Sequence, residues 1–241
     1  SKHTADMYLE NSLIISFNAS SYLTAINNLL VACNGLKKYT EMLAYLSILE
    51  ETRKDIKAPS DKALAFFYLY HHLNYFISTG LFAEAEEYVK RIESELSVHE
   101  RNLNRLQKII LYATIAQVHF GMGKYKRCLL WLNRVMALGE MKVRTDIECF
   151  IRLFYLIVHF EVKSDREFMG SLLKSTYRFL YKHQRIYKFE AVMLEFMRQN
   201  VVKEDKLSNM KEPFVALKKK LEQMSKDPYE KHALNYFDFI S

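Results

Sequence analysis

Glycine and proline are scarce in this sequence, which has six glycines and three prolines among 241 residues. Both residues interrupt helices, so their scarcity leaves few sharp turns and many stretches in which a helix can continue. No segment shows the strict alternation of apolar and polar residues that marks a half-buried strand. The sequence therefore predicts an all-α fold.

Paired cysteines and long apolar runs are also missing. Cys33, Cys128 and Cys149 are odd in number and lie within apolar stretches, which indicates buried thiols in a reducing compartment. The longest apolar run, residues 147–162, contains three charged residues and a histidine, too many for a helix that spans a bilayer. We therefore expect a cytoplasmic protein that enters no membrane, and we interpret this run as a buried helix.

The residue patterns of common catalytic and metal sites are not found. The sequence has no His-Glu-x-x-His, no Cys-x-x-Cys, no phosphate-binding glycine-rich loop and no Gly-x-Ser-x-Gly. His71 and His72 are adjacent on a helix and therefore point away from each other, and His119 and His159 lie in aromatic runs without a carboxylate at ligand spacing. Glu148 and Arg152 are four residues apart, which predicts an ion pair along a helix. We expect no enzyme activity, no metal and no cofactor.

One short sequence motif occurs twice, at residues 80–85 and 123–128. It consists of a glycine, an aromatic residue two positions later, and a small residue three positions further on. The aromatic positions recur every 43 residues, at Tyr39, Phe82, Tyr125 and Phe168. The positions three residues later are mostly small: Met42, Ala85, Cys128 and Ser171. A fixed period of this length is typical of stacked helical pairs, each of which buries its apolar face only against a neighbour.

Apolar periodicity predicts helices at residues 6–17, 21–34, 38–56, 61–78, 82–96, 101–120, 125–138, 143–162, 164–181 and 187–201, with two more beginning near Pro213 and Asp227. Gly35 should end the second helix, and residues 97–100 and 164–167 have the spacing of capping boxes. The helix at 82–96 is amphipathic, and its charged residues should face water: Glu84, Glu86, Glu87, Lys90 and Arg91.

We predict a single helical-repeat domain over residues 1–241, with the clearest repeats at 20–140 and degenerate repeats at 141–241. Because the chain starts without methionine and stops within an aromatic helical pattern, we expect a fragment of a longer protein. The formal net charge is +7, and residues 163–231 hold 16 Lys and Arg against 10 Asp and Glu. The basic excess therefore belongs to the C-terminal third.

The repeated units resemble tetratricopeptide repeats. The match lies in the glycine between two helices, the aromatic residue that follows it, and apolar residues seven and ten positions later, as at Phe82, Val89 and Ile92. The resemblance implies an α-solenoid of antiparallel helical pairs in a right-handed superhelix. It also implies a concave groove, lined by the first helix of each pair, that binds a peptide or helix of a partner protein. The period of 43 residues exceeds the 34 usual for this family, which implies longer helices or links.

Counting back from the turn aromatics places twelve residues on the groove side of the first helices: Thr24, Asn27, Val31, Asn34, Phe67, Tyr70, Asn74, Ile77, Ile110, Ala113, Gln117 and Phe120. Amide side chains both donate to and accept from the backbone of an extended peptide. We therefore expect the partner-binding groove to be carried by Asn27, Asn34, Tyr70, Asn74 and Gln117.

Two alternatives stay open. The first is nucleic-acid binding by the C-terminal third, where three tyrosines adjoin a basic patch of Arg178, Lys182, Arg185 and Lys188. This alternative needs exposed rings, because bases stack only on accessible aromatic faces. The second is a regulatory domain that senses a peptide and passes the signal to a neighbouring domain. The sequence leaves the identity of the partner, the pathway and the oligomeric state open.

Overall fold

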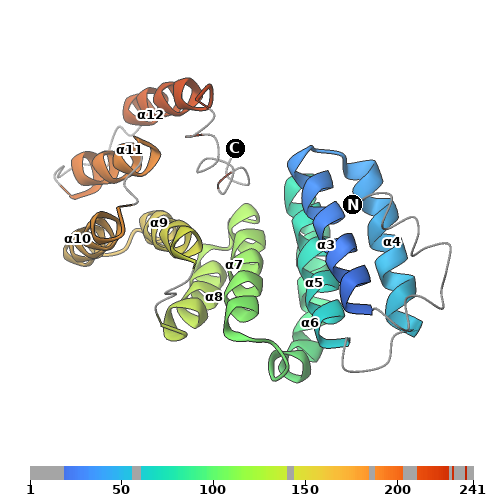
Figure 1. Cartoon of the computed structure of the whole chain (residues 1–241). Helices are drawn as coiled ribbons and strands as arrows, with labels where there is room; N and C mark the ends of the chain where they lie inside the picture. Colours follow the sequence, from blue (N-terminus) through green and yellow to red (C-terminus); the bar gives the residue numbers. More distant parts are fainter. Residues whose placement is uncertain are drawn as a thin grey trace. The chain divides into compact units, whose positions relative to one another are not determined.

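The computed structural model describes residues 19–55, 61–139, 144–184, 188–202, 211–227, 230 and 237, and within them the chain has helices and no strand. The helices are α3 (Ala19–Gly35), α4 (Tyr39–Asp55), α5 (Asp61–Ser78), α6 (Phe82–Glu100), α7 (Arg105–Gly121), α8 (Tyr125–Ala137), α9 (Thr145–Glu161), α10 (Arg166–Lys182), α11 (Lys188–Met197), the π-helix η1 (Arg198–Val202) and α12 (Lys211–Met224) (Figure 1). The predicted all-α fold is confirmed.

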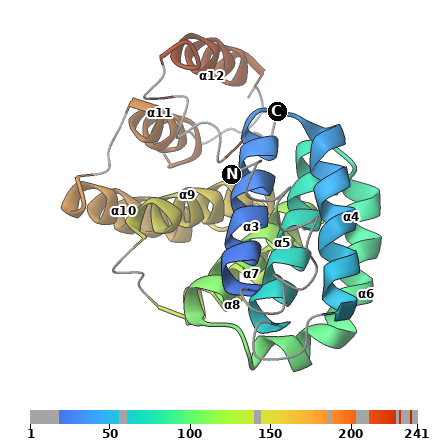
Figure 2. The same cartoon turned by 45° about the vertical axis from the view of Figure 1, so that its right-hand side comes forward.

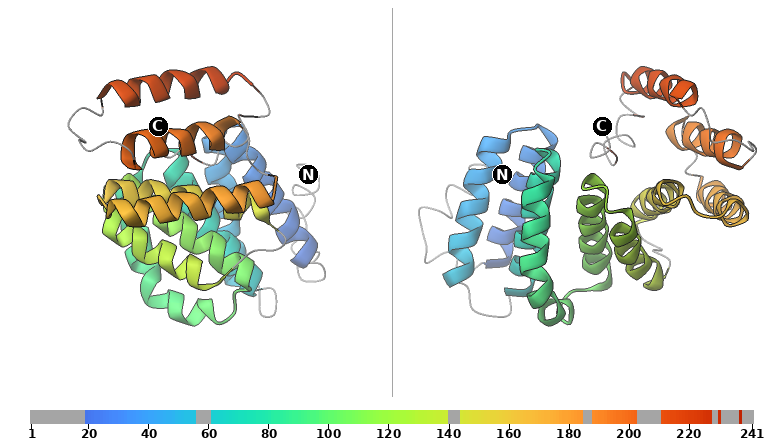
Figure 3. Two further views of the ribbon diagram at one scale, coloured as in Figure 1. Left: turned by 90° about the vertical axis from the view of Figure 1, so that its left-hand side faces the viewer. Right: turned by 180° about the vertical axis from the view of Figure 1, so that it is seen from behind.

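The chain divides into two compact units, with the boundary between Gly123 and Lys124. In the first unit each helix from α3 to α7 contacts the next, and α5 also contacts both α3 and α7 (Figure 2). In the second unit α9 contacts both α8 and α10, while α11 packs against α12 (Figure 3). Packing between sequential neighbours is the arrangement of a helical repeat. The single domain over residues 1–241 stays a prediction.

Most predicted helix limits agree with the structure, and α5 has the predicted limits. The helix expected at 6–17 lies outside the described residues, as does most of the one expected from Asp227. No helix among the described residues is long and apolar enough to cross a bilayer.

The two predicted capping boxes are wrong, because α6 continues through Glu100 and α10 is capped by Asp165. The Asp165 carboxylate accepts hydrogen bonds from the backbone of Glu167 and Phe168. A capping box does begin α7, where the side chains of Asn104 and Gln107 each accept a hydrogen bond from the other's backbone N–H at 2.9 Å.

The repeat is visible in the backbone as one left-handed residue after the first helix of each pair. These residues are Lys37 (φ 56°), Gly80 (φ 74°) and Gly123 (φ 67°), which are 43 residues apart. Each donates its N–H to the carbonyl three residues earlier, at 3.0, 3.1 and 2.8 Å respectively. The side chains five positions later, Met42, Ala85 and Cys128, are fully buried. The predicted period therefore holds through three turns.

The fourth turn leaves this register. Its left-handed residue is Lys163 (φ 56°), 40 residues after Gly123. Two residues separate Lys163 from α10, whereas one residue separates Gly123 from α8. Phe168 is 44 % exposed and Ser171 is also exposed, while Met169 is buried. The predicted equivalence of Phe168 and Ser171 with the earlier copies is therefore wrong.

The predicted end of the second helix at Gly35 is confirmed, but this glycine is not the left-handed residue of the turn. Gly35 is the last residue of α3, and the left-handed residue that follows the helix is Lys37. A residue with a Cβ in the left-handed region is strained by roughly 1–2 kcal/mol. The turn between α3 and α4 therefore has the geometry of the turn at Gly80 without its glycine.

We expect Lys37→Gly to raise the free energy of unfolding by about 0.5–1 kcal/mol and Gly80→Ala to lower it by about 1 kcal/mol, because the left-handed conformation favours glycine. Gly35→Ala is the matched control and should not destabilise, since a Cβ at Gly35 meets no atom within 4 Å. Urea unfolding followed by circular dichroism measures all three changes. A lower free energy of unfolding for Gly35→Ala, with no increase for Lys37→Gly, would contradict the left-handed geometry assigned to Lys37.

Candidate interaction surfaces

The twelve residues predicted for the groove lie on α3, α5 and α7, helices of the first unit that pack side by side. We call this set the α3/α5/α7 face. Ile77 and Ala113 are its only buried members, and Val31 is 54 % exposed. The same helices bury another stripe completely, with Leu30 and Leu73 at 0 % exposure. Most of the α3/α5/α7 face is therefore at least partly accessible, in contrast to the buried stripe of the same helices.

Two of the amides on this face take part in packing within the unit. Asn27 Oδ1 lies 2.9 Å from His71 Nε2, so that the ring donates to the amide across the contact between α3 and α5. His71 is buried, and its burial, with a smaller effect of His72, lowers its pKa to about 4. Asn34 Oδ1 is enclosed by the protein and accepts no hydrogen bond from a described residue. Neither oxygen is placed to hold a partner.

The remaining predicted groove residues stay accessible. Tyr70 is half-buried and stacks on Phe66 with ring centroids 5.6 Å apart. Asn74 and Gln117 are half-buried, occupy equivalent positions 43 residues apart, and their amides make no hydrogen bond with another described residue. These two amides are therefore available to the backbone of a bound peptide.

Glu86 corrects the prediction that every charged residue of α6 faces water. Its side chain is only 5 % exposed, and its Oε1 lies 4.0 Å from Nδ1 of the buried His119 on α7. Glu84, Glu87, Lys90 and Arg91 are exposed as predicted. The contact was missed because Glu86 and His119 come from different helices, and single-sequence spacing detects pairs only within one helix.

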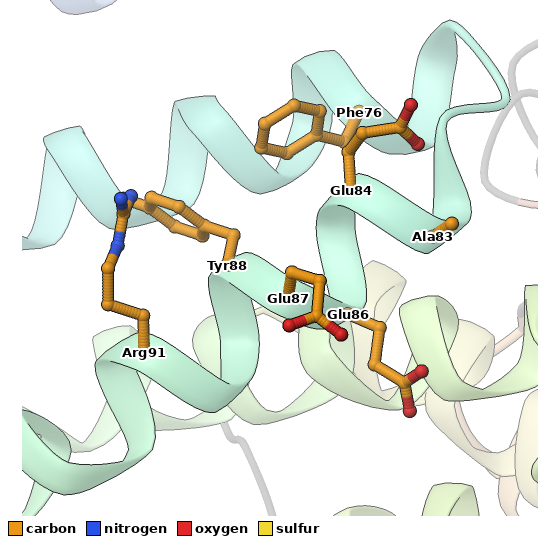
Figure 4. A pocket seen from close by; sticks show the side chains of 7 residues that line it. All are labelled: Phe76, Ala83, Glu84, Glu86, Glu87, Tyr88 and Arg91. Carbon is orange, nitrogen blue, oxygen red and sulfur yellow. The ribbon is translucent and has the colours of Figure 1, made fainter.

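A pocket of about 680 Å³ lies beside Glu86 on the first unit, between the end of α5 and the start of α6 (Figure 4). Its lining consists of Phe76, Ala83, Glu84, Glu86, Glu87, Tyr88 and Arg91. The Arg91 guanidinium lies over the Tyr88 ring, 4.9 Å from its centroid, and Glu87 pairs with Lys90 at 2.6 Å. The three carboxylates disfavour anions in this pocket, but their charge alone identifies no ligand.

The predicted basic patch is only partly brought together. Arg178 and Lys182 are exposed on α10, whereas Lys188 begins α11 and its Nζ lies 3.3 Å from Asp227 Oδ2. Arg185 lies outside the described residues. Nucleic-acid binding by this region requires exposed aromatic rings. Two of the three tyrosines meet this requirement, since Tyr177 is 50 % exposed and Tyr181 is 69 % exposed.

The orientation of α10 follows from how its other side packs. Met169, Leu173, Phe179 and Leu180 are buried, and α10 packs on α9. The predicted ion pair of Glu148 and Arg152 on α9 is confirmed at 2.8 Å. The same guanidinium lies over the Phe179 ring, 4.0 Å from its centroid. This contact joins the buried side of α10 to α9 and leaves Tyr177 and Tyr181 outward.

No group of three or more His, Cys, Asp or Glu among the described residues is placed to hold a metal ion. The three cysteines are buried thiols. Comparison with protein-family models, with curated proteins and with solved structures gave no match to this chain.

The buried His71 predicts a loss of stability in acid. Its pKa of about 4 in the folded protein lies below the ordinary 6.5, so the unfolded chain binds the proton more strongly. Stability from this group should be complete above pH 6.5 and fall by roughly 3 kcal/mol as the pH drops to 4. Urea unfolding from pH 7 to 4 should therefore show a smaller decline for His71→Gln than for the parent chain. Equal declines in both chains would refute the assignment.

Proposed function

We propose that the chain is a divergent tetratricopeptide-like scaffold whose α3/α5/α7 face binds an extended peptide or a helix of a partner protein. In this proposal it performs no catalysis, holds no cofactor and works in a reducing compartment such as the cytoplasm. The left-handed turns at Lys37, Gly80 and Gly123 support the tetratricopeptide kinship, because they repeat at one spacing between antiparallel helices. The right-handed superhelix belongs to the same proposal.

The observation that carries this proposal is the pair Asn74 and Gln117. They lie at equivalent positions of two contacting helices, are partly exposed, and form no hydrogen bond with other described residues. A peptide crossing α5 and α7 offers backbone N–H and C=O groups at regular intervals, and an amide side chain satisfies either kind. Tyr70 adds a half-buried aromatic ring beside them.

The contribution of the Asn74 and Gln117 amides to peptide affinity can be estimated from the hydrogen bonds that they would form. Each neutral hydrogen bond contributes about 0.5–1.5 kcal/mol, so two together contribute about 1–3 kcal/mol and change an affinity by about 5- to 150-fold. The rest of the affinity would come from apolar contact with the exposed Val31 and the half-buried Ile110 and Phe120. A scaffold of this kind therefore binds sequences with apolar side chains on one side of the peptide.

To test this proposal, random displayed peptides are selected on the full chain, and the affinity of the retained peptides is measured by fluorescence anisotropy. We expect Asn74→Ala/Gln117→Ala to weaken binding by about fivefold or more, because the two amides hold the peptide backbone. Asn102→Ala is the matched control, since Asn102 is an exposed amide of the same unit outside the α3/α5/α7 face.

The control variant should bind as tightly as the parent chain. Peptides that bind the parent and the double variant equally, with both proteins folded by circular dichroism, would place the binding site elsewhere. A selection that enriches no peptide would also count against the scaffold.

A further inference from the structure

The exposed side of α10 combines aromatic rings and cations. The helix positions 174, 177, 178, 181 and 182 are three or four residues apart and form one continuous surface of α10 beside the buried stripe of Met169, Leu173 and Leu180. We call Lys174, Tyr177, Arg178, Tyr181 and Lys182 the α10 face. Its five side chains are all exposed.

All charged residues of the α10 face are positively charged. Residues 168–184 contain no Asp or Glu, and no carboxylate of a described residue pairs with Lys174, Arg178 or Lys182. The whole second unit has the same bias, with 23 Lys and Arg against 15 Asp and Glu, whereas the first unit is close to neutral. The α10 face therefore suits a polyanion.

The two rings narrow the choice of polyanion. Tyr177 and Tyr181 are nearly parallel, with 18° between their planes and centroids 6.1 Å apart, and at least half of each residue is exposed. The carboxylates of an acidic peptide would pair with the cations but do not stack on aromatic rings, whereas every nucleotide carries an aromatic base. A nucleic-acid duplex keeps its bases stacked inside, whereas a single strand can lay its bases on aromatic rings.

We propose that the α10 face binds single-stranded nucleic acid, with Lys174, Arg178 and Lys182 contacting phosphates and with Tyr177 and Tyr181 stacking on bases. This activity is independent of the proposed peptide-binding function, because it uses the second unit. It corresponds in part to the basic patch predicted from the sequence, without Lys188, whose ammonium is paired with Asp227.

The test measures the anisotropy of fluorescein-labelled oligothymidylate and oligouridylate with the full chain, at several salt concentrations between about 50 and 200 mM. We expect saturable binding of one or both oligonucleotides, and their comparison distinguishes DNA from RNA. Tyr177→Ala/Tyr181→Ala should weaken binding by about fivefold or more for each ring that stacks.

The charge variant tests the phosphate contacts. Arg178→Gln/Lys182→Gln should reduce the slope of log affinity against log salt by about 1.4, the value for two contacts to a single strand. Lys126→Gln/Arg127→Gln is the matched control, because it removes two exposed cations of the same unit on α8. The control should change the slope much less.

A direct readout of stacking comes from Tyr181→Trp, whose fluorescence should be quenched when an oligonucleotide binds. The native Trp131 is 6 % exposed and should contribute an unchanged background. Asn74→Ala/Gln117→Ala should bind oligonucleotides as the parent does, so this proposal and the peptide proposal fail separately.

Three results would overturn the proposal. The first is no saturable binding of either oligonucleotide at the lowest salt. The second is an equal loss of oligonucleotide affinity in the α10 charge variant and in the α8 control, which would indicate non-specific electrostatic attraction to the whole unit. The third is tighter binding of polyglutamate than of oligonucleotides that persists in Tyr177→Ala/Tyr181→Ala, which would assign the face to an acidic protein partner.

Discussion

Each helix that the structure describes buries its apolar stripe mainly against the helices next to it in sequence. This packing requires turns that orient each helix against the preceding one. The left-handed residues Lys37, Gly80 and Gly123 supply that return at one spacing. They place Met42, Ala85 and Cys128 at equivalent, fully buried positions. Packing between neighbours then leaves part of each first helix accessible, and this part includes most of the α3/α5/α7 face.

The same constraint explains why the two proposed surfaces differ in chemistry. In the first unit α5 is packed by neighbours on several sides, and the polar groups that it contributes to the α3/α5/α7 face are Tyr70 and Asn74. In the second unit α10 uses its buried side on α9 and leaves Tyr177 and Tyr181 outward among cations. Ordered amides suit a peptide backbone, whereas exposed rings with positive charge suit a flexible polyanion.

The fold was predictable because helix periodicity and the 43-residue repeat are local signals. The limits of α5 and the pair of Glu148 and Arg152 were obtained in this way. Contacts between helices were not predictable: the hydrogen bond of His71 with Asn27 and the burial of Glu86 against His119 depend on packing. The end of α3 at Gly35 was predicted, but the left-handed conformation of Lys37 was not, because a lysine gives no local signal for it.

The most direct test of the scaffold asks which surface a selected peptide touches. A photoreactive benzoylphenylalanine is placed, one at a time, in place of the exposed residues Val31, Glu84 and Tyr177, which represent the α3/α5/α7 face, the acidic pocket and the α10 face. After irradiation, cross-linked peptide is quantified by mass spectrometry. The account predicts cross-linking from the position of Val31 and none from the other two. Cross-linking from Glu84 or Tyr177 without cross-linking from Val31 would contradict it.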